Sequence, residues 1–153
     1  MTPEDRIQIE ALMFRYARCV DTAAYEELGK LFEDGEITSN KSRPDGKPGM
    51  RGIEPVATFY ATTNKSHGPG GKDGPLTHHI VTNVEYEKIA ADEVTVRSCF
   101  VVYQATPRLP LQPIVCGRYR DVFQRKPAGW AFRSKFIEVT LVGNISEHLS
   151  IPL

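Results

Sequence analysis

The spacing of apolar residues changes abruptly near Leu76, and this change limits the folds that the chain can adopt. Before Leu76, apolar side chains recur every three or four residues, which is typical of helices with one buried stripe. After Leu76, they alternate with polar residues along several long segments, as in strands with one buried face. Helices followed by long antiparallel strands predict an α+β fold in which a strongly curved sheet packs against the N-terminal helices.

Three helices are predicted before this change. The first begins with Thr2 as its N-cap, and the second ends before Asp34-Gly35 and carries an apolar stripe of Tyr25, Leu28, Leu31 and Phe32. Asp21 lies at the elbow between them and is itself a residue type that caps helices well. The third helix begins near Ile53, and residues 64–75 then form a loop rich in glycine and proline. This loop is either a mobile flap or a plain connection.

Long strands bounded by turn-forming residues are predicted after the change, and a short strand over residues 36–39 precedes them. Alternation places Phe100 and Gln104 on the inner face of the sheet, and the same rule places Tyr119 there. The proline-rich residues 106–113 are expected to interrupt the sheet. The long strands are predicted over residues 77–88, 94–105, 114–125 and 130–141.

Composition favours one domain over residues 1–153, because 153 residues of which 41% are hydrophobic can bury a sizeable core. With 19 basic and 19 acidic residues the net charge is zero, so neither nucleic acid nor a membrane surface is an expected partner. The three cysteines lack the spacing of a zinc site and the even count of a disulfide framework. The N-terminus is charged and no apolar run approaches membrane-spanning length, so a cytoplasmic location is expected.

Two adjacent histidines, His78 and His79, open the first long strand. Neighbouring strand residues point to opposite faces, so one imidazole is expected to face the interior and the other the surface. Imidazole groups change protonation near neutral pH, which makes an inward-facing one a ready general acid or base. Because the two side chains diverge, they are not expected to share a metal ion.

Three segments carry a resemblance to a known family. They are FRYARCVDTAAYEELGKLF in the helical half, THHIVTNVEYE followed by DEV, and GRYRDVFQRKPAGWAF near the end. In these segments the chain resembles the NTF2-like superfamily, the cone-shaped α+β fold of ketosteroid isomerase. Within it, the chain is similar to the SnoaL-like branch that includes scytalone dehydratase and lindane dehydrochlorinase. The resemblance runs from Ile9 to about Val139.

The resemblance implies a catalytic pair. In both named enzymes an aspartate at the first elbow and a histidine early in the long strand act together, and they match Asp21 and His79. Asn83 also matches the dehydrochlorinase. The chain departs from the family pattern at Gln104, where scytalone dehydratase has a second catalytic histidine, and at Tyr16, near which the dehydrochlorinase has a lysine.

The chemistry implied is an elimination or isomerisation that needs no metal and no other cofactor. The carboxylate holds the imidazole, which then moves a proton within an apolar cavity. The expected partner is a hydrophobic cyclic small molecule, and the enzyme class is a dehydratase, another lyase, or an isomerase. Candidate substrate-binding residues are Tyr16, Tyr60, Phe100, Gln104 and Tyr119.

Each of these interpretations has a structural alternative. Asp21 fits a simple helix N-cap, and His79 fits a core histidine bonded to a backbone carbonyl. His67 fits either a lid residue or a solvated loop residue. A non-catalytic ligand-binding protein, or an assembly subunit like the β chain of ring-hydroxylating dioxygenases, would have the same fold.

The outer face of the sheet is expected to need a partner. Cys99, Val101 and Tyr103 alternate with the inner set and make this face apolar. Members of the resembled superfamily associate through this face, which implies a homodimer or a homotrimer.

Overall fold

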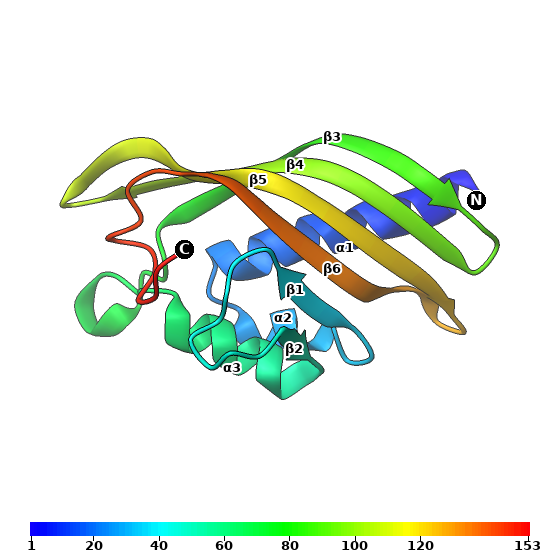
Figure 1. Ribbon diagram of the computed structural model, residues 1–153, viewed down its shortest axis with the longest axis horizontal. Coiled ribbons are helices and arrows are strands. Elements are labelled where there is room, and N and C mark those ends of the chain that lie inside the picture. Colours follow the sequence, from blue (N-terminus) through cyan, green and yellow to red (C-terminus); the bar gives the residue numbers. More distant parts are fainter.

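Three α-helices form the first structural group of the computed structural model, which describes residues 1–153 (Figure 1). Thr2 caps the first of them, as predicted: its hydroxyl accepts a hydrogen bond from the Asp5 backbone N–H, and the Asp5 carboxylate accepts one from the Thr2 backbone N–H. Each helix is too short or too polar to cross a lipid bilayer. The helices are α1 (Pro3–Asp21), α2 (Tyr25–Lys30) and α3 (Ile53–Thr63).

The second group is one open sheet of six strands in the order β2-β1-β6-β5-β4-β3. Strands β1 and β6 are parallel, and all other neighbours are antiparallel. The predicted α+β fold is therefore confirmed. The strands are β1 (Glu36–Ser39), β2 (Gly49–Arg51), β3 (Thr77–Ile89), β4 (Glu93–Thr106), β5 (Leu109–Lys126) and β6 (Gly129–Val142).

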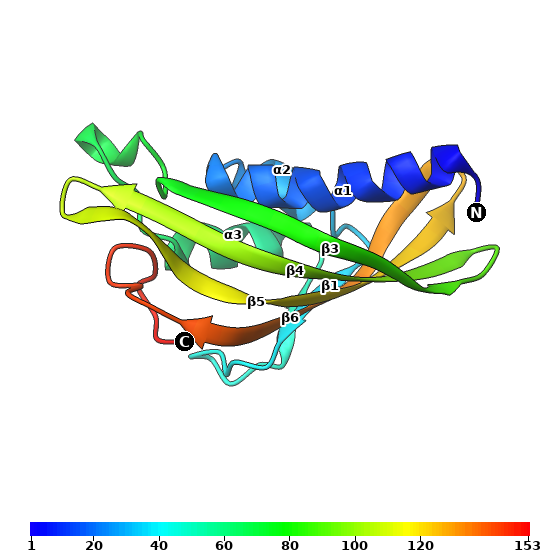
Figure 2. The same cartoon turned by 90° about the horizontal axis from the view of Figure 1, so that it is seen from above.

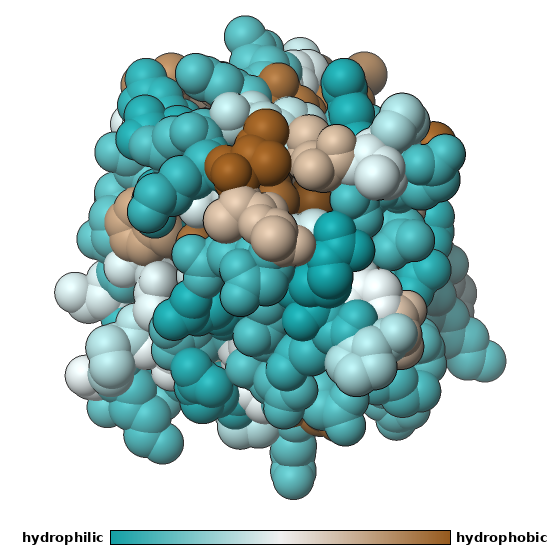
Figure 3. Space-filling view, turned by 90° about the vertical axis from the view of Figure 1, so that its right-hand side faces the viewer, coloured by the Kyte–Doolittle hydropathy of each residue, from teal (hydrophilic) through white to brown (hydrophobic).

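The helices pack against one face of this curved sheet (Figures 1 and 2). Val96 and Phe100 on that face are buried, whereas Arg118 and Arg120 on the other face are exposed, as alternation predicts. The core therefore lies between the helices and the inner face of the sheet. The end of the molecule that carries the N-terminus is largely hydrophilic, with one small hydrophobic patch (Figure 3).

Two predicted boundaries are wrong. Strand β5 begins at Leu109, so Pro110 and Pro113 lie within the sheet rather than in a break. This part of β5 pairs with β4 alone, because the pairing with β6 ends at Val115, and prolines are tolerated where one side of a strand is unpaired. The second helix is also shorter than predicted, and strand β2 was not foreseen.

A buried ion pair joins β5 to β6 inside the core. Asp121 lies directly opposite Lys135, and the ammonium nitrogen is 3.0 Å from the nearer carboxylate oxygen. The two side chains are 0% and 1% exposed. The ammonium also lies 3.5 Å from the ring centre of Tyr119 and 4.3 Å from that of Tyr16. Burial lowers the pKa of Lys135 and raises the pKa of Asp121, while the attraction between their charges opposes both shifts.

Gly117 allows two aromatic rings to stack on the inner face. The ring centres of Phe100 and Tyr119 are 4.3 Å apart and the rings are nearly parallel. A Cβ atom at Gly117 would lie 2.7 Å from the Phe100 ring and 2.0 Å from the Glu138 carbonyl oxygen.

Gly117→Ala is therefore expected to lower the free energy of unfolding by about 1–3 kcal/mol in urea denaturation. Cys116→Ala, one residue away on the outer face, is the control, and equal stability of the two variants would contradict this account.

Candidate functional site

Asp21 and His79 meet where α1 ends and β3 begins. The Asp21 Oδ1 atom lies 2.5 Å from His79 Nδ1, and Asp21 Oδ2 accepts a hydrogen bond from the His79 backbone N–H at 2.9 Å. The Thr77 hydroxyl donates a third hydrogen bond to Asp21 Oδ1 at 2.8 Å. The Asp21 and His79 side chains are only 15% and 7% exposed. The predicted pair is thus in direct contact.

This contact argues against the N-cap interpretation of Asp21. Asp21 is the last residue of α1, and the N-cap of α2 is Ala24, which makes no side-chain hydrogen bond. His79 likewise does not bond a backbone carbonyl, because its Nδ1 atom faces the carboxylate. Its neighbour His78 is exposed, as strand alternation predicts.

The backbone around the pair adopts uncommon conformations. Ala23, two residues after Asp21, has a φ of 55°, and Leu76, three residues before His79, has a φ of 54°. Gly74 from the 64–75 loop lies against this elbow, where a Cβ atom would be 3.6 Å from the Ala23 Cβ. Such backbone conformations cost free energy and are common at functional sites.

The hydrogen bonds fix the protonation states that matter for chemistry. Burial alone would raise the pKa of Asp21, but the hydrogen bonds from His79 and Thr77 outweigh it and lower that pKa below its usual value. Asp21 is therefore a carboxylate at neutral pH. Since a carboxylate only accepts hydrogen bonds, His79 Nδ1 carries a hydrogen, and Nε2 is the nitrogen available for proton transfer.

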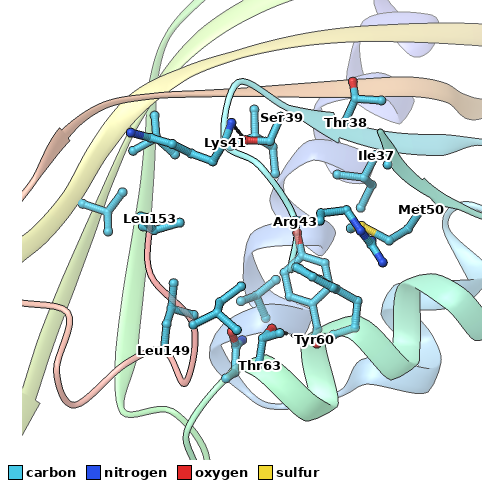
Figure 4. A pocket seen from close by; sticks show the side chains of 18 of the residues that line it. Ile37, Thr38, Ser39, Lys41, Arg43, Met50, Tyr60, Thr63, Leu149 and Leu153 are labelled. Carbon is cyan, nitrogen blue, oxygen red and sulfur yellow. Dashed lines mark hydrogen bonds between the residues drawn. The ribbon is translucent and has the colours of Figure 1, made fainter. Parts of the chain in front are cut away.

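A cavity of about 150 Å³ lies beside His79. Of the 27 residues that line it, 15 are hydrophobic, and they come from α1, from the inner face of the sheet, from α3 and from the C-terminal segment, residues 143–153. Lys41 and Arg43 add two cationic side chains to the lining. Ile37 and Met50 lie on one side of it, and Leu149 and Leu153 lie on the opposite side (Figure 4). A cavity of this volume and lining suits a ligand with one apolar ring.

Two tyrosine hydroxyl groups supply polar atoms in the cavity lining. Tyr16 Oη and Tyr60 Oη are 2.7 Å apart, and both residues are buried. One hydroxyl donates to the other, so the pair itself uses only one of its two hydroxyl hydrogens. Burial raises the pKa of Tyr60 to about 12 and that of Tyr16 well above its usual value, so both groups are neutral donors.

Gln104 is the one predicted substrate-binding residue that lies outside the cavity lining. Its Nε2 atom donates hydrogen bonds to the backbone carbonyls of Pro75 at 2.8 Å and of Glu147 at 3.0 Å. It does not line the cavity, because the C-terminal segment lies against it. The other four candidates, Tyr16, Tyr60, Phe100 and Tyr119, do line the cavity. Asn83 lies at an irregularity in β3, is exposed and has a φ of 54°, a left-handed conformation that asparagine adopts more readily than most residues.

His148 in the C-terminal segment is a cavity residue that the sequence analysis missed. It is 6% exposed and lines the same cavity as His79. Burial, together with the neighbouring His79, lowers its pKa to about 4. No periodic pattern surrounds His148, and the only signal in the sequence is an isolated histidine followed by the apolar residues Leu149, Ile151 and Leu153.

The buried His148 predicts a pH dependence of stability. An unfolded histidine has a pKa of about 6.5, so between pH 6.5 and pH 4 the unfolded state binds a proton that the folded state does not. Stability conferred by this residue is thus fully present above pH 6.5 and falls by about 2–3 kcal/mol as the pH drops from 7 to 4.5. Urea unfolding at pH 7 and pH 4.5 should show a smaller decrease in the free energy of unfolding for His148→Gln than for wild type. An equal decrease in both proteins would show that His148 is not the group responsible.

Comparison with solved structures defines the fold class. An NTF2-like protein with a cystatin-like fold from Novosphingobium aromaticivorans superimposes with a TM-score of 0.70 and 23% sequence identity, over 94% of this chain and 86% of that chain. The three helices on an open, curved six-stranded sheet are accordingly an NTF2-like cone.

Two further structures from the same organism share this fold. A candidate scytalone dehydratase has a TM-score of 0.66 and 22% identity, over 93% of this chain and 91% of that chain. The β subunit of a candidate aromatic-ring-hydroxylating dioxygenase has a TM-score of 0.66 and 16% identity, over 94% of both chains.

The sequence itself identifies the family within this fold. Residues 1–135 match the SnoaL-like domain, so the chain belongs to the SnoaL-like family, as the resemblance indicated. No curated protein sequence matches the chain significantly.

Proposed function

We propose that this protein is a cofactor-independent enzyme, a dehydratase, another lyase or an isomerase, that acts on a hydrophobic cyclic small molecule. The observation that carries the proposal is the hydrogen bond between Asp21 and His79 beside an apolar cavity. A buried carboxylate and imidazole in direct contact form a general acid–base unit when the free imidazole nitrogen can reach a substrate. The apolar cavity favours a substrate held mainly by burial of its ring.

The reaction follows from the two groups. His79 Nε2 removes a proton from a carbon next to an electron-withdrawing group, and Asp21 stabilises the imidazolium that forms. The electron pair of the broken C–H bond then forms a double bond. In an elimination, the leaving group departs with its bonding electrons, and a hydroxyl group leaves as water after it takes up a proton. In an isomerisation, the same proton returns to another carbon.

The tyrosine pair completes this arrangement. Negative charge develops on an oxygen of the substrate as the proton leaves its carbon, and a neutral hydroxyl donor stabilises that charge. The hydroxyl hydrogen that is not used within the Tyr16–Tyr60 pair is suited to this role. Phe100 and Tyr119 provide the stacked aromatic wall against which a ring packs.

The alternative is a non-catalytic binding protein or an assembly subunit. The observation that favours it is a pair of exposed aromatic side chains on the outer face of the sheet, where Tyr103 and Phe136 are 37% and 38% exposed among charged residues such as Arg118 and Arg120. This face also supports association into a homodimer or homotrimer, which suits an enzyme equally well. The two functions differ in whether a bound ligand undergoes proton transfer.

The test is a screen of one-ring ketones and hydroxyketones in D₂O, followed by nuclear magnetic resonance. An enzyme exchanges a substrate C–H hydrogen for deuterium or converts the compound, and the reaction requires His79. His79→Gln removes the proposed base, while His78→Gln changes the exposed neighbour and is the matched control. Compounds that bind without exchange or conversion, or equal rates for wild type and His79→Gln, would favour the binding protein.

A further inference from the structure

Residues 146–148 are held in place by several hydrogen bonds from distant parts of the chain. The Glu147 carbonyl accepts from Gln104 Nε2 at 3.0 Å and lies 2.8 Å from His67 Nε2. The Lys65 backbone N–H donates to the His148 carbonyl at 2.7 Å, and the Lys65 ammonium donates to the Ser146 carbonyl at 2.7 Å. The backbone that carries His148 is thus fixed on both sides of this residue.

The side chain of His148 has no such partner. Its Nδ1 atom is fully buried and makes no hydrogen bond within the protein. Buried polar side-chain atoms in folded proteins are nearly always paired, so an unpaired one beside a cavity points to a partner from outside the chain. A neutral imidazole offers one N–H donor, which can bind a ketone or alcohol oxygen, and one nitrogen acceptor, which can bind only an alcohol hydroxyl hydrogen.

We infer that His148 binds the polar oxygen of the ligand, a one-ring ketone or alcohol, in addition to the donor of the Tyr16–Tyr60 pair, while His79 faces one of its C–H bonds. This inference deepens the proposed function and rests on it, because it takes the cavity beside His79 as the place where the ring binds. Both imidazoles line that cavity. His148 fixes the end of the ring that carries the oxygen, and this orients the remaining carbons toward the base.

The charge of His148 narrows the ligand class. Burial keeps the imidazole uncharged at neutral pH, so it provides a hydrogen bond without a full positive charge. Lys41 and Arg43 also line the cavity, but at His148 itself a carboxylate would lose hydration that a neutral imidazole does not offset. A ketone or alcohol oxygen loses less hydration free energy than a carboxylate does, and it can accept a hydrogen bond from His148.

The experiment compares two probes of nearly equal shape, cyclohexanone and methylenecyclohexane, in which C=CH₂ replaces C=O. Their Kd values are measured by nuclear magnetic resonance titration for wild type, His148→Phe and His148→Gln. The ratio of the hydrocarbon Kd to the ketone Kd is expected to fall by about 3–10-fold in His148→Phe, as for the loss of one hydrogen bond. His148→Gln keeps a donor and an acceptor and should restore part of the ratio.

The hydrocarbon is the internal control for structure. Unchanged binding of methylenecyclohexane by His148→Phe shows that the cavity and the C-terminal segment are intact. Absence of ketone binding by wild type, or the same Kd ratio in wild type and His148→Phe, would overturn the inference.

Failure of this inference can be told apart from failure of the proposed function. His79→Gln should abolish proton exchange but keep the ketone preference, because His148 is unchanged. Ketone binding that depends on His148 without turnover of any ring compound would remove the enzyme proposal and leave this inference standing. If turnover depends on His79 but the Kd ratio does not depend on His148, this inference fails and the enzyme proposal stands.

Discussion

Replacing Asp21 with asparagine is expected to lower turnover by about 10²–10⁴-fold while the protein stays folded. Both carboxylate oxygens accept hydrogen bonds: Oδ1 from the Thr77 hydroxyl and His79 Nδ1, and Oδ2 from the His79 backbone N–H. An amide has only one oxygen, so its NH₂ group must face a donor in either orientation. If it faces His79 Nδ1, the imidazole must accept there and place its hydrogen on Nε2, which removes the base.

The loss of charge has a second effect on the same step. The imidazolium that forms during proton removal is stabilised by the carboxylate, and asparagine provides no compensating charge. The measurement is kcat as a function of pH for wild type, Asp21→Asn and Thr77→Val, with any substrate from the screen. Thr77→Val removes one hydrogen-bond donor but keeps the Asp21–His79 pair, so its decrease in kcat should be much smaller than that of Asp21→Asn. An Asp21→Asn variant with the wild-type kcat would show that the pair is structural.

Replacing Lys135 with methionine is expected to lower the free energy of unfolding by about 3–5 kcal/mol. Methionine fills a similar volume, so the main effect is the Asp121 carboxylate left buried without its partner. Both carboxylate oxygens now accept hydrogen bonds from the ammonium, at 3.0 and 3.1 Å. Urea unfolding at pH 7 measures the loss.

A double variant separates the lost pair from lost packing. Asp121→Leu combined with Lys135→Met removes both charges, and it should recover most of the stability that the single variant loses. Lowering the pH should also reduce the deficit of Lys135→Met, because burial raises the pKa of Asp121 and the neutral acid is less costly to bury. Equal instability of the single and double variants would assign the effect to packing.

The order of helices and strands could be predicted because burial determines the period of apolar residues. The inner positions of β4 and β5, such as Phe100 and Tyr119, follow directly from alternation. Alternation does not say whether an inward side chain reaches a cavity or another segment, and Gln104 faces inward but bonds the C-terminal segment instead of lining the cavity. The prolines of β5 were misread because the sequence does not show where a neighbouring strand ends.

The candidate site was predictable only in part. Asp21 and His79 could be paired because each lies at a recognisable boundary, the end of a helix and the start of a strand, and because the family resemblance joins them. His148 and Lys135 lie in no such pattern. Their roles depend on which distant segments cover them, and this information is held by the three-dimensional arrangement rather than by local spacing.

Three aromatic rings, those of Tyr16, Tyr119 and Phe132, surround the Lys135 ammonium group. An acylating reagent that modifies surface amines therefore reaches this lysine only when the native state opens, in contrast to the exposed amines of the chain. Mass-spectrometric quantification of modified Lys135 over time would report the rate of such opening. Because the residue lies outside the cavity lining, the same readout would measure how far a bound compound slows that opening, without any need for a chromogenic substrate.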